Sequence, residues 1–345
     1  MPRLLPFPRI YHPTAGITEQ LPVTRNGIRS LSPFPFSATE GPTLPSLLIR
    51  NGETGRTVHG VCGLLPATCF TDGSVLPHER TLTSRLERQE RLVTADRGAL
   101  GKPVLLTTPA LNYSHPHPEK ESDGQVIFYG DDHIYRLQCS PSVPAQSFEI
   151  DGPLVIADGH HRAYTHARLA ESGREDCRFV PVVIAGADEL VIGTFLRLID
   201  GGGISVTALA DGLSHHFTVT PTASPAPPEQ PGRWLLSYRD HHFRLARPAS
   251  AGTDTDPGYI NEVVLPTLFG ITDTRTDPRF ASVDPPPVVE GEAHFDPAKS
   301  DKIKLLGFPL PRERFFSEVE AGRTLPPKST RFEPRVPSGL LVWIP

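Results

Sequence analysis

Proline is the feature of this sequence that most restricts its fold. The 345-residue chain contains 39 prolines, spread along its length without a repeat. Each proline fixes φ and removes a backbone hydrogen-bond donor, so it interrupts helices and central strands. An apolar share of 38% is still typical of a globular chain with a buried core. The sequence therefore predicts an α/β or α+β fold, with a mixed sheet of short strands and few helices.

Local patterns place several of these elements. Two apolar runs separated by turn residues predict hairpins over residues 46–70, 124–139 and 234–248. An amphipathic helix is expected within 76–100, and a buried strand, a turn and a helix within 152–172. The pattern alone does not say which strands pair with one another.

A proline-rich segment, residues 220–233, suggests how the chain is organised. Five of its fourteen residues are proline, which is typical of a linker, although an exposed loop inside one domain fits it equally well. We predict an N-terminal α/β domain over 1–219 and a C-terminal α+β region over 234–345. The C-terminal region is expected to return its last segment to the site carried by the first domain.

The totals argue against several classes of partner. The net charge of −5 gives no electrostatic footprint for nucleic acid, so no nucleic-acid partner is expected. No apolar run is long enough for a membrane helix. The four cysteines lack zinc-ligand spacing, which predicts buried free thiols and a cytoplasmic protein. A homodimer is one assembly that we keep open.

The stretch LVIADGHHRAYTHARLA is the first candidate site. Four apolar residues lead into Asp158 and Gly159, and a helix is expected to begin near His160. Placing His160, His161 and Arg162 in a first helical turn opposes the helix dipole, and an anionic ligand such as phosphate would relieve that conflict. Asp158 is predicted either to cap the helix or to hold Mg²⁺ beside a phosphate.

Two further motifs contain chemically able side chains. In LPHERT, Glu79 is a candidate general base between His78 and Arg80, although the same residues also suit a helix start. In PPKSTRFEPR, Lys328 adds a positive charge and is followed by two hydroxyl side chains. A solvated basic loop is the plain alternative for that segment.

The three motifs together resemble the signature blocks of one family. The blocks GSVLPHERT, LVIADGHHRAYTHA and LPPKSTRFEPRVPSGLLV occur here in the order and spacing of the bacterial and archaeal domain of unknown function family 1015. The resemblance covers roughly residues 45 to 345. Its DGHHR block is in turn similar to the phosphate-holding helix start of the ParB/sulfiredoxin superfamily. This similarity implies a ParB/sulfiredoxin-like nucleotide-binding core.

That superfamily includes kinases of free serine, which sets the expected reaction. The resemblance implies a phosphotransferase that uses ATP or ADP with Mg²⁺ to phosphorylate the hydroxyl of a small amino-acid-like substrate. It implies four catalytic residues, with Asp158 also holding the metal: Glu79, Asp158, His160 and His161. The residues implied to contact the nucleotide are His78, Arg80, Thr81, Gly159, Arg162, Lys328, Ser329 and Thr330.

Two departures from the family pattern support a different hypothesis. The family's PPYD segment has no counterpart here. GTFLR stands where the family has PTHR, so Leu196 replaces a histidine while Arg197 is kept. The alternative is therefore a nucleotide- or phosphate-binding regulatory module without turnover.

Overall fold

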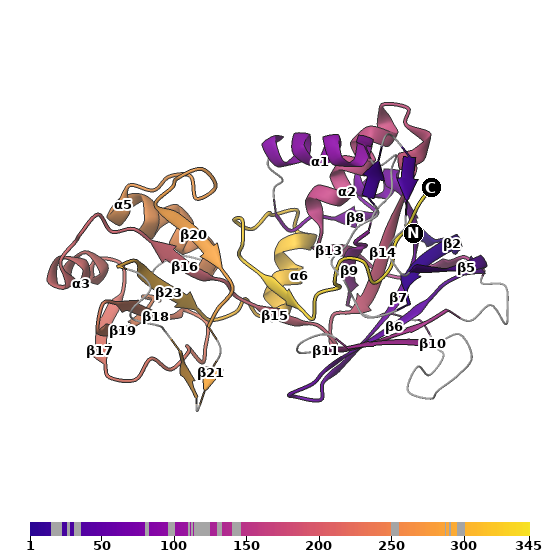
Figure 1. Cartoon of the computed structure of the whole chain (residues 1–345). Coiled ribbons are helices and arrows are strands. Elements are labelled where there is room, and N and C mark those ends of the chain that lie inside the picture. The colour runs from indigo at the N-terminus through magenta and orange to yellow at the C-terminus, as the bar shows by residue number, and fades with distance from the viewer. Residues whose placement is uncertain are drawn as a thin grey trace. The chain divides into compact units, whose positions relative to one another are not determined.

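In the computed structural model the chain divides into two units, each with its own sheet. The first consists of Met1–Val191 with Phe332–Pro345, and the second of Ile192–Arg331. Figure 1 shows both. The residues described are 1–14, 23–25, 28–30, 36–79, 83–95, 101–109, 111, 113, 125–129, 133–139, 146–249, 255–286, 288–289, 291–294 and 301–345.

The proline-rich segment does not separate these units. Strands β17 (Thr218–Thr222) and β18 (Arg233–Tyr238) belong to one sheet of the second unit, so the residues between them form a loop inside it. The structure instead divides the chain after Val191 and after Arg331. Strands β15 (Val191–Gly193) and β24 (Arg331–Glu333) pair where the chain crosses from one unit to the other.

An eight-stranded mixed sheet forms the centre of the first unit. The pairs β14–β9 and β13–β8 are parallel, and the other neighbours are antiparallel. In spatial order the strands are β10 (Gln125–Tyr129), β11 (His133–Gln138), β6 (Ser46–Asn51), β7 (Thr57–Pro66), β14 (Phe179–Gly186), β9 (Val104–Thr108), β13 (Leu154–Asp158) and β8 (Val75–Leu76). The predicted mixed sheet with few helices is confirmed.

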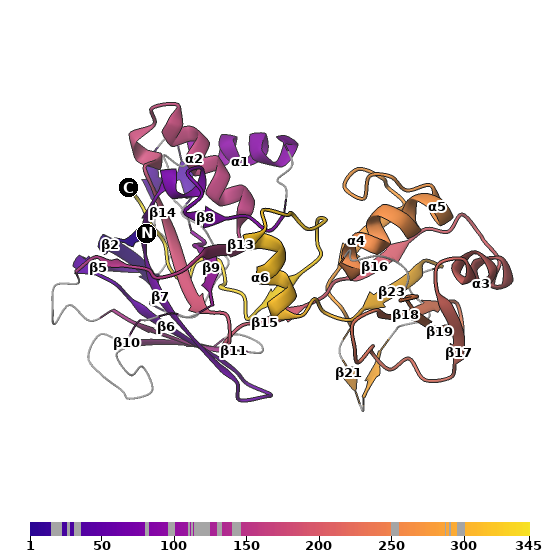
Figure 2. The ribbon, with the colours of Figure 1, turned by 180° about the vertical axis from the view of Figure 1, so that it is seen from behind.

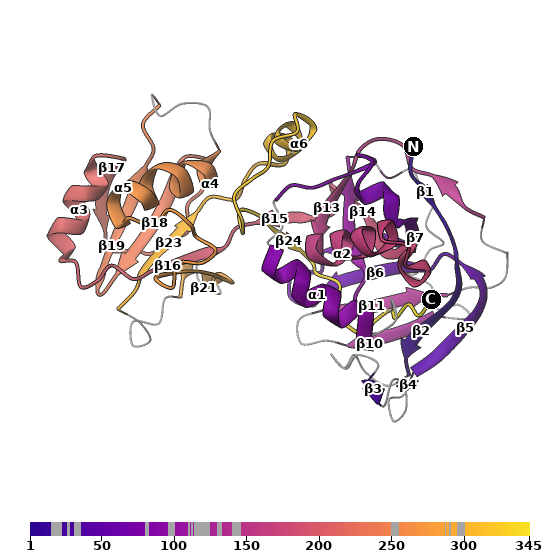
Figure 3. The same cartoon turned by 90° about the horizontal axis from the view of Figure 1, so that it is seen from above.

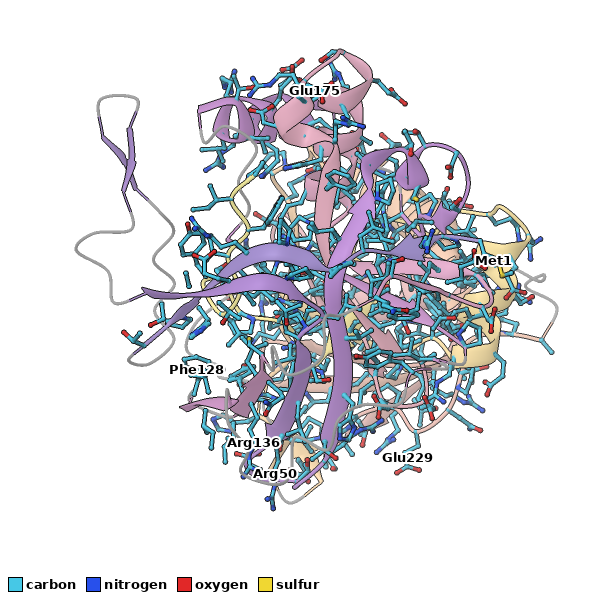
Figure 4. The ribbon with its side chains drawn as sticks, turned by 90° about the vertical axis from the view of Figure 1, so that its right-hand side faces the viewer. Met1, Arg50, Phe128, Arg136, Glu175 and Glu229 are labelled. Carbon is cyan, nitrogen blue, oxygen red and sulfur yellow. The ribbon has the colours of Figure 1, made fainter. Side chains whose placement is uncertain are left out.

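Helices α1 (Thr83–Ala95) and α2 (His160–Glu171) lie side by side on this unit (Figures 1 and 2). Ala163 and Ala167 of α2 pack into the same buried cluster as Leu106 of β9 and Ile156 of β13. The short 3₁₀ turns η1 (Ala67–Phe70) and η2 (Glu175–Cys177) adjoin α2. Figure 4 shows Glu175 on the opposite side of the unit from Arg50 and Arg136, which belong to β6 and β11.

The N-terminal segment and the C-terminal tail pack on each other. Tyr11 and Val342 exchange backbone hydrogen bonds of 3.1 and 2.9 Å, and the side chains of residues 340–343 are buried. The C-terminal tail therefore docks on the N-terminal segment through a backbone bridge between Tyr11 and Val342. The neighbouring strand pairs (Figure 3) are β2 (Phe7–Pro13) with β5 (Phe36–Thr43), β1 (Arg3–Leu4) with β12 (Phe148–Glu149), and β3 (Val23–Arg25) with β4 (Ile28–Ser30).

The second unit is a six-stranded sheet with helices on one face. Its order is β17, β19 (His241–Ala246), β18, β23 (Ile303–Gly307), β16 (Leu196–Ile199) and β20 (Phe280–Val283). One face packs in a single cluster with residues of α3 (Val206–Ser214), α4 (Asp256–Tyr259), the π-turn η3 (Ile260–Val264) and α5 (Leu265–Phe269). The remaining elements are β21 (Val288–Val289), β22 (Glu292–Ala293) and α6 (Arg312–Glu320).

The predicted buried free thiols are present in the structure. All four cysteines are buried and free, and burial raises the pKa of Cys139 and Cys177 to about 12. Buried thiols of this kind are structural rather than reactive. Among the described helices, none has the length and apolar character needed to cross a bilayer.

Candidate functional site

Parallel strand pairing brings the first two motifs together. Val75 and Leu76 of β8 lie opposite Leu154 and Val155 of β13 in parallel register. Because the two strands run in the same direction, the segments that follow them leave the sheet at the same edge. His78 and Glu79 therefore lie beside the DGHHR turn, 80 positions further along the chain.

Contacts of the His78 and His160 imidazoles link these two segments. The backbone N–H of His78 donates to Nε2 of His160 at 3.3 Å, and Nδ1 of His78 lies 2.6 Å from the carbonyl oxygen of Ile156. The two imidazoles meet edge to face, with centroids 4.4 Å apart. Nδ1 of His160 lies 3.8 Å from Oε1 of Glu79. His160 is thus held between a backbone donor and the carboxylate.

These contacts make His160 a neutral residue. A backbone N–H can only donate, so Nε2 of His160 must be unprotonated, and the ring proton is assigned to Nδ1 on the Glu79 side. Burial, followed by the neighbouring His78, holds the pKa of His160 well below its ordinary value. The expected positive charge on His160 is therefore corrected, because burial and the N–H donor at Nε2 favour the neutral form and outweigh the carboxylate of Glu79 near Nδ1.

The buried histidines predict an acid-sensitive fold. Burial also lowers the pKa of His78, so both rings stay neutral in the native state while the unfolded chain takes up protons below about pH 6.5. Stability is therefore lost as the pH falls below that value. We expect His78→Gln to make urea stability fall less steeply between pH 6.5 and 5, by up to about 1.4 kcal/mol per pH unit.

Urea denaturation at several pH values, followed by circular dichroism, measures this slope. Replacing exposed His241 with glutamine is the matched control, and the wild-type slope should be kept there. An unchanged slope in the His78 variant would contradict the buried-histidine explanation.

Asp158 is the centre of a second group of contacts. Strand β9 runs antiparallel to β13 with Leu105 opposite Asp158, so the residues before β9 lie at the same edge. Oδ2 of Asp158 is 3.2 Å from Nζ of Lys102 and 3.1 Å from Nη2 of Arg162. Burial alone would raise the pKa of Asp158, but the charges of Arg162 and Lys102 hold it well below the ordinary range.

This arrangement excludes one of the two roles predicted for Asp158, that of helix cap. The N-cap position of α2 is Gly159, with φ of 110° and no side-chain capping bond, so Asp158 does not cap the helix. It is the counter-ion of two cations. Lys102, which precedes β9 in the sequence GKPVLL, was not predicted to belong to the site.

Arg162 has an unused donor at the start of α2. Its Nη2 also donates to the carbonyl oxygen of Pro103 at 3.3 Å, whereas its buried Nε has no partner among the described residues. The guanidinium lies over Gly159, where a Cβ would come within 2.7 Å of Nη2. Glycine is thus needed both for the positive φ and for the position of Arg162. The open helix N-terminus and this N–H donor both suit an anion.

The remaining predicted residues fall into three groups. Arg80 and Thr81 lie outside the described residues. His161 is half-buried in the first turn of α2. Lys328, Ser329 and Thr330 belong to the second unit, where Nζ of Lys328 lies 4.9 Å from the ring centroid of Phe195 and Ser329 donates to the carbonyl of Pro326. That these three residues contribute to the site of the first unit remains a prediction.

The third motif is divided between the units. Its residues up to Arg331 belong to the second unit, whereas Phe332 belongs to the first. The Phe332 ring is buried, with its centroid 5.7 Å from that of His78. The C-terminal block thus reaches the candidate site through an aromatic side chain that was not predicted to belong to it.

Arg197, kept from the family's PTHR segment, is a buried residue of the second unit. It lies on β16, its Nη2 has no partner among the described residues, and burial lowers its pKa to about 10. Its neighbour Leu196 packs in a small apolar cluster with Leu235 and Leu306. At position 196 this chain therefore has a packing residue rather than a titratable one.

The site fits Mg²⁺ only with help from a ligand. The described part of the chain contains no group of three His, Cys, Asp or Glu side chains that could hold a metal. Both cations contact Oδ2 of Asp158, and its Oδ1 has no partner among the described residues. Mg²⁺ is commonly bound by one or two carboxylates together with substrate phosphates and water. The residues present fit that mode of binding.

The fold and this edge of the sheet define an α+β protein with a charged site between a strand and a helix. The chain belongs to the family described as protein of unknown function (DUF1015), whose sequence profile matches residues 44–267. That range contains the first two motifs but not the third. The assignment of the third motif to the family still rests on the resemblance of its own residues. No curated protein sequence matches the chain.

Several solved structures are similar at low identity. A C-terminally truncated SbnI from Staphylococcus aureus has a TM-score of 0.46 and 17% identity over 80% of this chain and 85% of that chain. A mutant free serine kinase in complex with ADP has 0.45 and 16% over 82% and 91%. A conserved hypothetical protein from Pyrococcus furiosus has 0.41 and 17% over 80% and 93%.

Proposed function

We propose that the first unit binds a nucleotide and transfers a phosphoryl group from it to the hydroxyl of a small amino-acid-like molecule. The observation that carries this proposal is the group formed by Asp158, Lys102 and Arg162 at the N-terminus of α2. Two cations and an uncapped helix start converge there, the buried Nε of Arg162 has no partner among the described residues, and a carboxylate lies at the adjacent strand end.

The phosphates are assigned to the cationic side of this group. Nε of Arg162 and the first N–H groups of α2 can donate to phosphate oxygens, and Lys102 adds a compact positive charge. Such fixed donors stabilise the charge on a transferring phosphoryl group without reorganising. Beyond Arg162, contacts to the nucleotide are proposed for His78, Arg80, Thr81, Gly159, Lys328, Ser329 and Thr330.

Glu79 is assigned the proton of the acceptor. Its side chain is about 20% exposed, and its Oε1 lies 3.8 Å from Nδ1 of the neutral His160, beside the turn. The acceptor hydroxyl gives its proton to Glu79 while its oxygen forms a bond to the terminal phosphorus. The bond from that phosphorus to the bridging oxygen breaks, and its electron pair leaves with ADP when ATP is the donor, or with AMP when ADP is.

The neutral His160 changes how the other predicted catalytic residues take part. His160 positions Glu79 rather than adding charge, and His161 stays a proposed phosphate contact. Mg²⁺, when bound, supplies positive charge that neutralises the phosphate oxygens, and Oδ1 of Asp158 is the protein ligand proposed for it. The choice of a hydroxy amino acid as the acceptor rests on the motif resemblance.

The test is a direct assay of the purified full chain with MgCl₂. ATP or ADP is offered with serine, threonine and homoserine, and phosphorylated products are followed by ³¹P nuclear magnetic resonance and mass spectrometry. A phosphorylated amino acid is the expected result. Calorimetry with the same nucleotides separates the alternatives. Binding without turnover would support the regulatory module suggested by Leu196, and absence of binding would contradict both proposals.

A further inference from the structure

A cavity in the second unit lies on the other face of its sheet from the helices. Its volume is about 280 Å³, close to the lower end of the range of small-molecule sites. Strands β17, β18 and β19 form its floor, and the proline-rich loop 223–232 contributes Ala226, Pro228 and Glu229 to its lining. Figure 4 labels Glu229.

The strand register collects the polar side chains of the floor on one face. Thr218, Ala246 and Arg233 lie opposite one another across β17, β19 and β18, and Thr220 lies opposite Arg244 two residues along. Side chains two residues apart on a strand point to the same face. Both arginines and both threonines therefore face the loop, and the arginines occupy diagonal positions about 7–8 Å apart.

The loop above this floor is held in place at both ends. The carbonyl oxygen of Pro225 accepts a hydrogen bond from the N–H of Ala293 at 3.1 Å, and the N–H of Gly232 donates to Oδ2 of Asp256 at 2.6 Å. Prolines within the loop restrict it further. The loop is thus fixed at both ends before any ligand arrives, which lowers the entropy cost of ordering it on binding.

The arginines and threonines that line the cavity have hydrogen-bond donors available for a ligand. Arg233, Arg244, Thr218 and Thr220 are exposed; within the described residues neither arginine has an acidic partner and neither threonine hydroxyl makes a hydrogen bond. A floor with two guanidinium groups and two hydroxyls suits a phosphate or carboxylate, which arginine binds through paired N–H donors. The loop's Pro228 provides an apolar wall, and Glu229 adds a carboxylate that can accept from a ligand hydroxyl or amine.

We propose that this cavity binds a small organic anion. The ligand carries one phosphate or carboxylate between Arg233 and Arg244, and a compact organic part beneath the proline-rich loop. This site is built from residues of the second unit alone and takes no part in the phosphoryl transfer proposed for the first.

Calorimetric titration of the full chain tests this proposal, with phenyl phosphate, benzoate and neutral phenyl glucoside as probes. We expect at least one of the two anions to bind with a dissociation constant of about 1 mM or below, and the neutral compound not to bind. The stronger of the two anions identifies the headgroup. Arg233→Gln and Arg244→Gln should each weaken that binding about tenfold or more.

Two further variants make the result decisive. Arg239→Gln removes the same charge from the turn of the same hairpin, outside the cavity, and should keep the wild-type affinity. Arg162→Gln, in the first unit, should also leave this binding in place. Absence of binding by both anions would overturn the proposal, and so would affinities that change in the Arg162 variant but not in the Arg233 and Arg244 variants.

Discussion

Replacing Glu79 with glutamine is expected to slow phosphoryl transfer by about 10²- to 10⁴-fold, the usual contribution of a positioned general base. Glutamine keeps the size of the side chain and its contact with His160, but it cannot take the acceptor's proton. Nucleotide affinity should stay within about threefold of wild type, because the phosphates are assigned to Arg162 and Lys102 instead. Turnover assays and calorimetry on the same preparation measure the two effects.

The matched control is Glu87→Gln, an exposed glutamate on α1 that should keep full activity. Thermal unfolding shows whether the Glu79 variant is folded. Retained nucleotide binding is a second check, because loss of activity through unfolding would also abolish binding. If Glu79→Gln retained a tenth or more of the wild-type rate, the proton acceptor would have to be another group.

Much of the fold could be predicted because it depends on local chemistry. The hairpin of β6 and β7 follows from Asn51 and the turn residues after it, and the β13–α2 unit follows from an apolar run that ends in Asp158 and Gly159. These signals act over a few residues. They do not specify that β8, only two residues long, pairs in parallel with β13, because that choice depends on the packing of the whole sheet.

The candidate site, like the fold, could be predicted only where it depends on residues close together in the sequence. Arg162 could be identified from the sequence because its motif has an unusual concentration of charge. Lys102 could not, since it reaches Asp158 only through the antiparallel pairing of β9 with β13. The neutral state of His160 could not be predicted from the sequence either, because it depends on burial and on an N–H donor from His78. The spacing of charged residues predicts a site, but tertiary contacts decide which of them carry charge.

Asp158→Asn is expected to separate metal binding from phosphate binding. The substitution preserves the shape of the side chain while removing the negative charge that Lys102 and Arg162 now share. With that charge removed, the two cations face an incoming phosphate without competition. Nucleotide affinity measured without metal should therefore be unchanged or higher.

Mg²⁺-dependent turnover should respond in the opposite direction. Asp158 is the carboxylate proposed to hold the ion, and an amide oxygen is a much weaker ligand for Mg²⁺, so we expect turnover at saturating nucleotide to fall by about 100-fold or more. Asp211→Asn on the exposed face of α3 is the control. If Asp158→Asn weakened metal-free nucleotide binding and left the Mg²⁺ dependence of turnover intact, Asp158 would be a structural partner that orients Arg162, and the metal would need another ligand. Nucleotide affinity that is kept or raised while turnover falls is a result that general destabilisation of the site cannot produce.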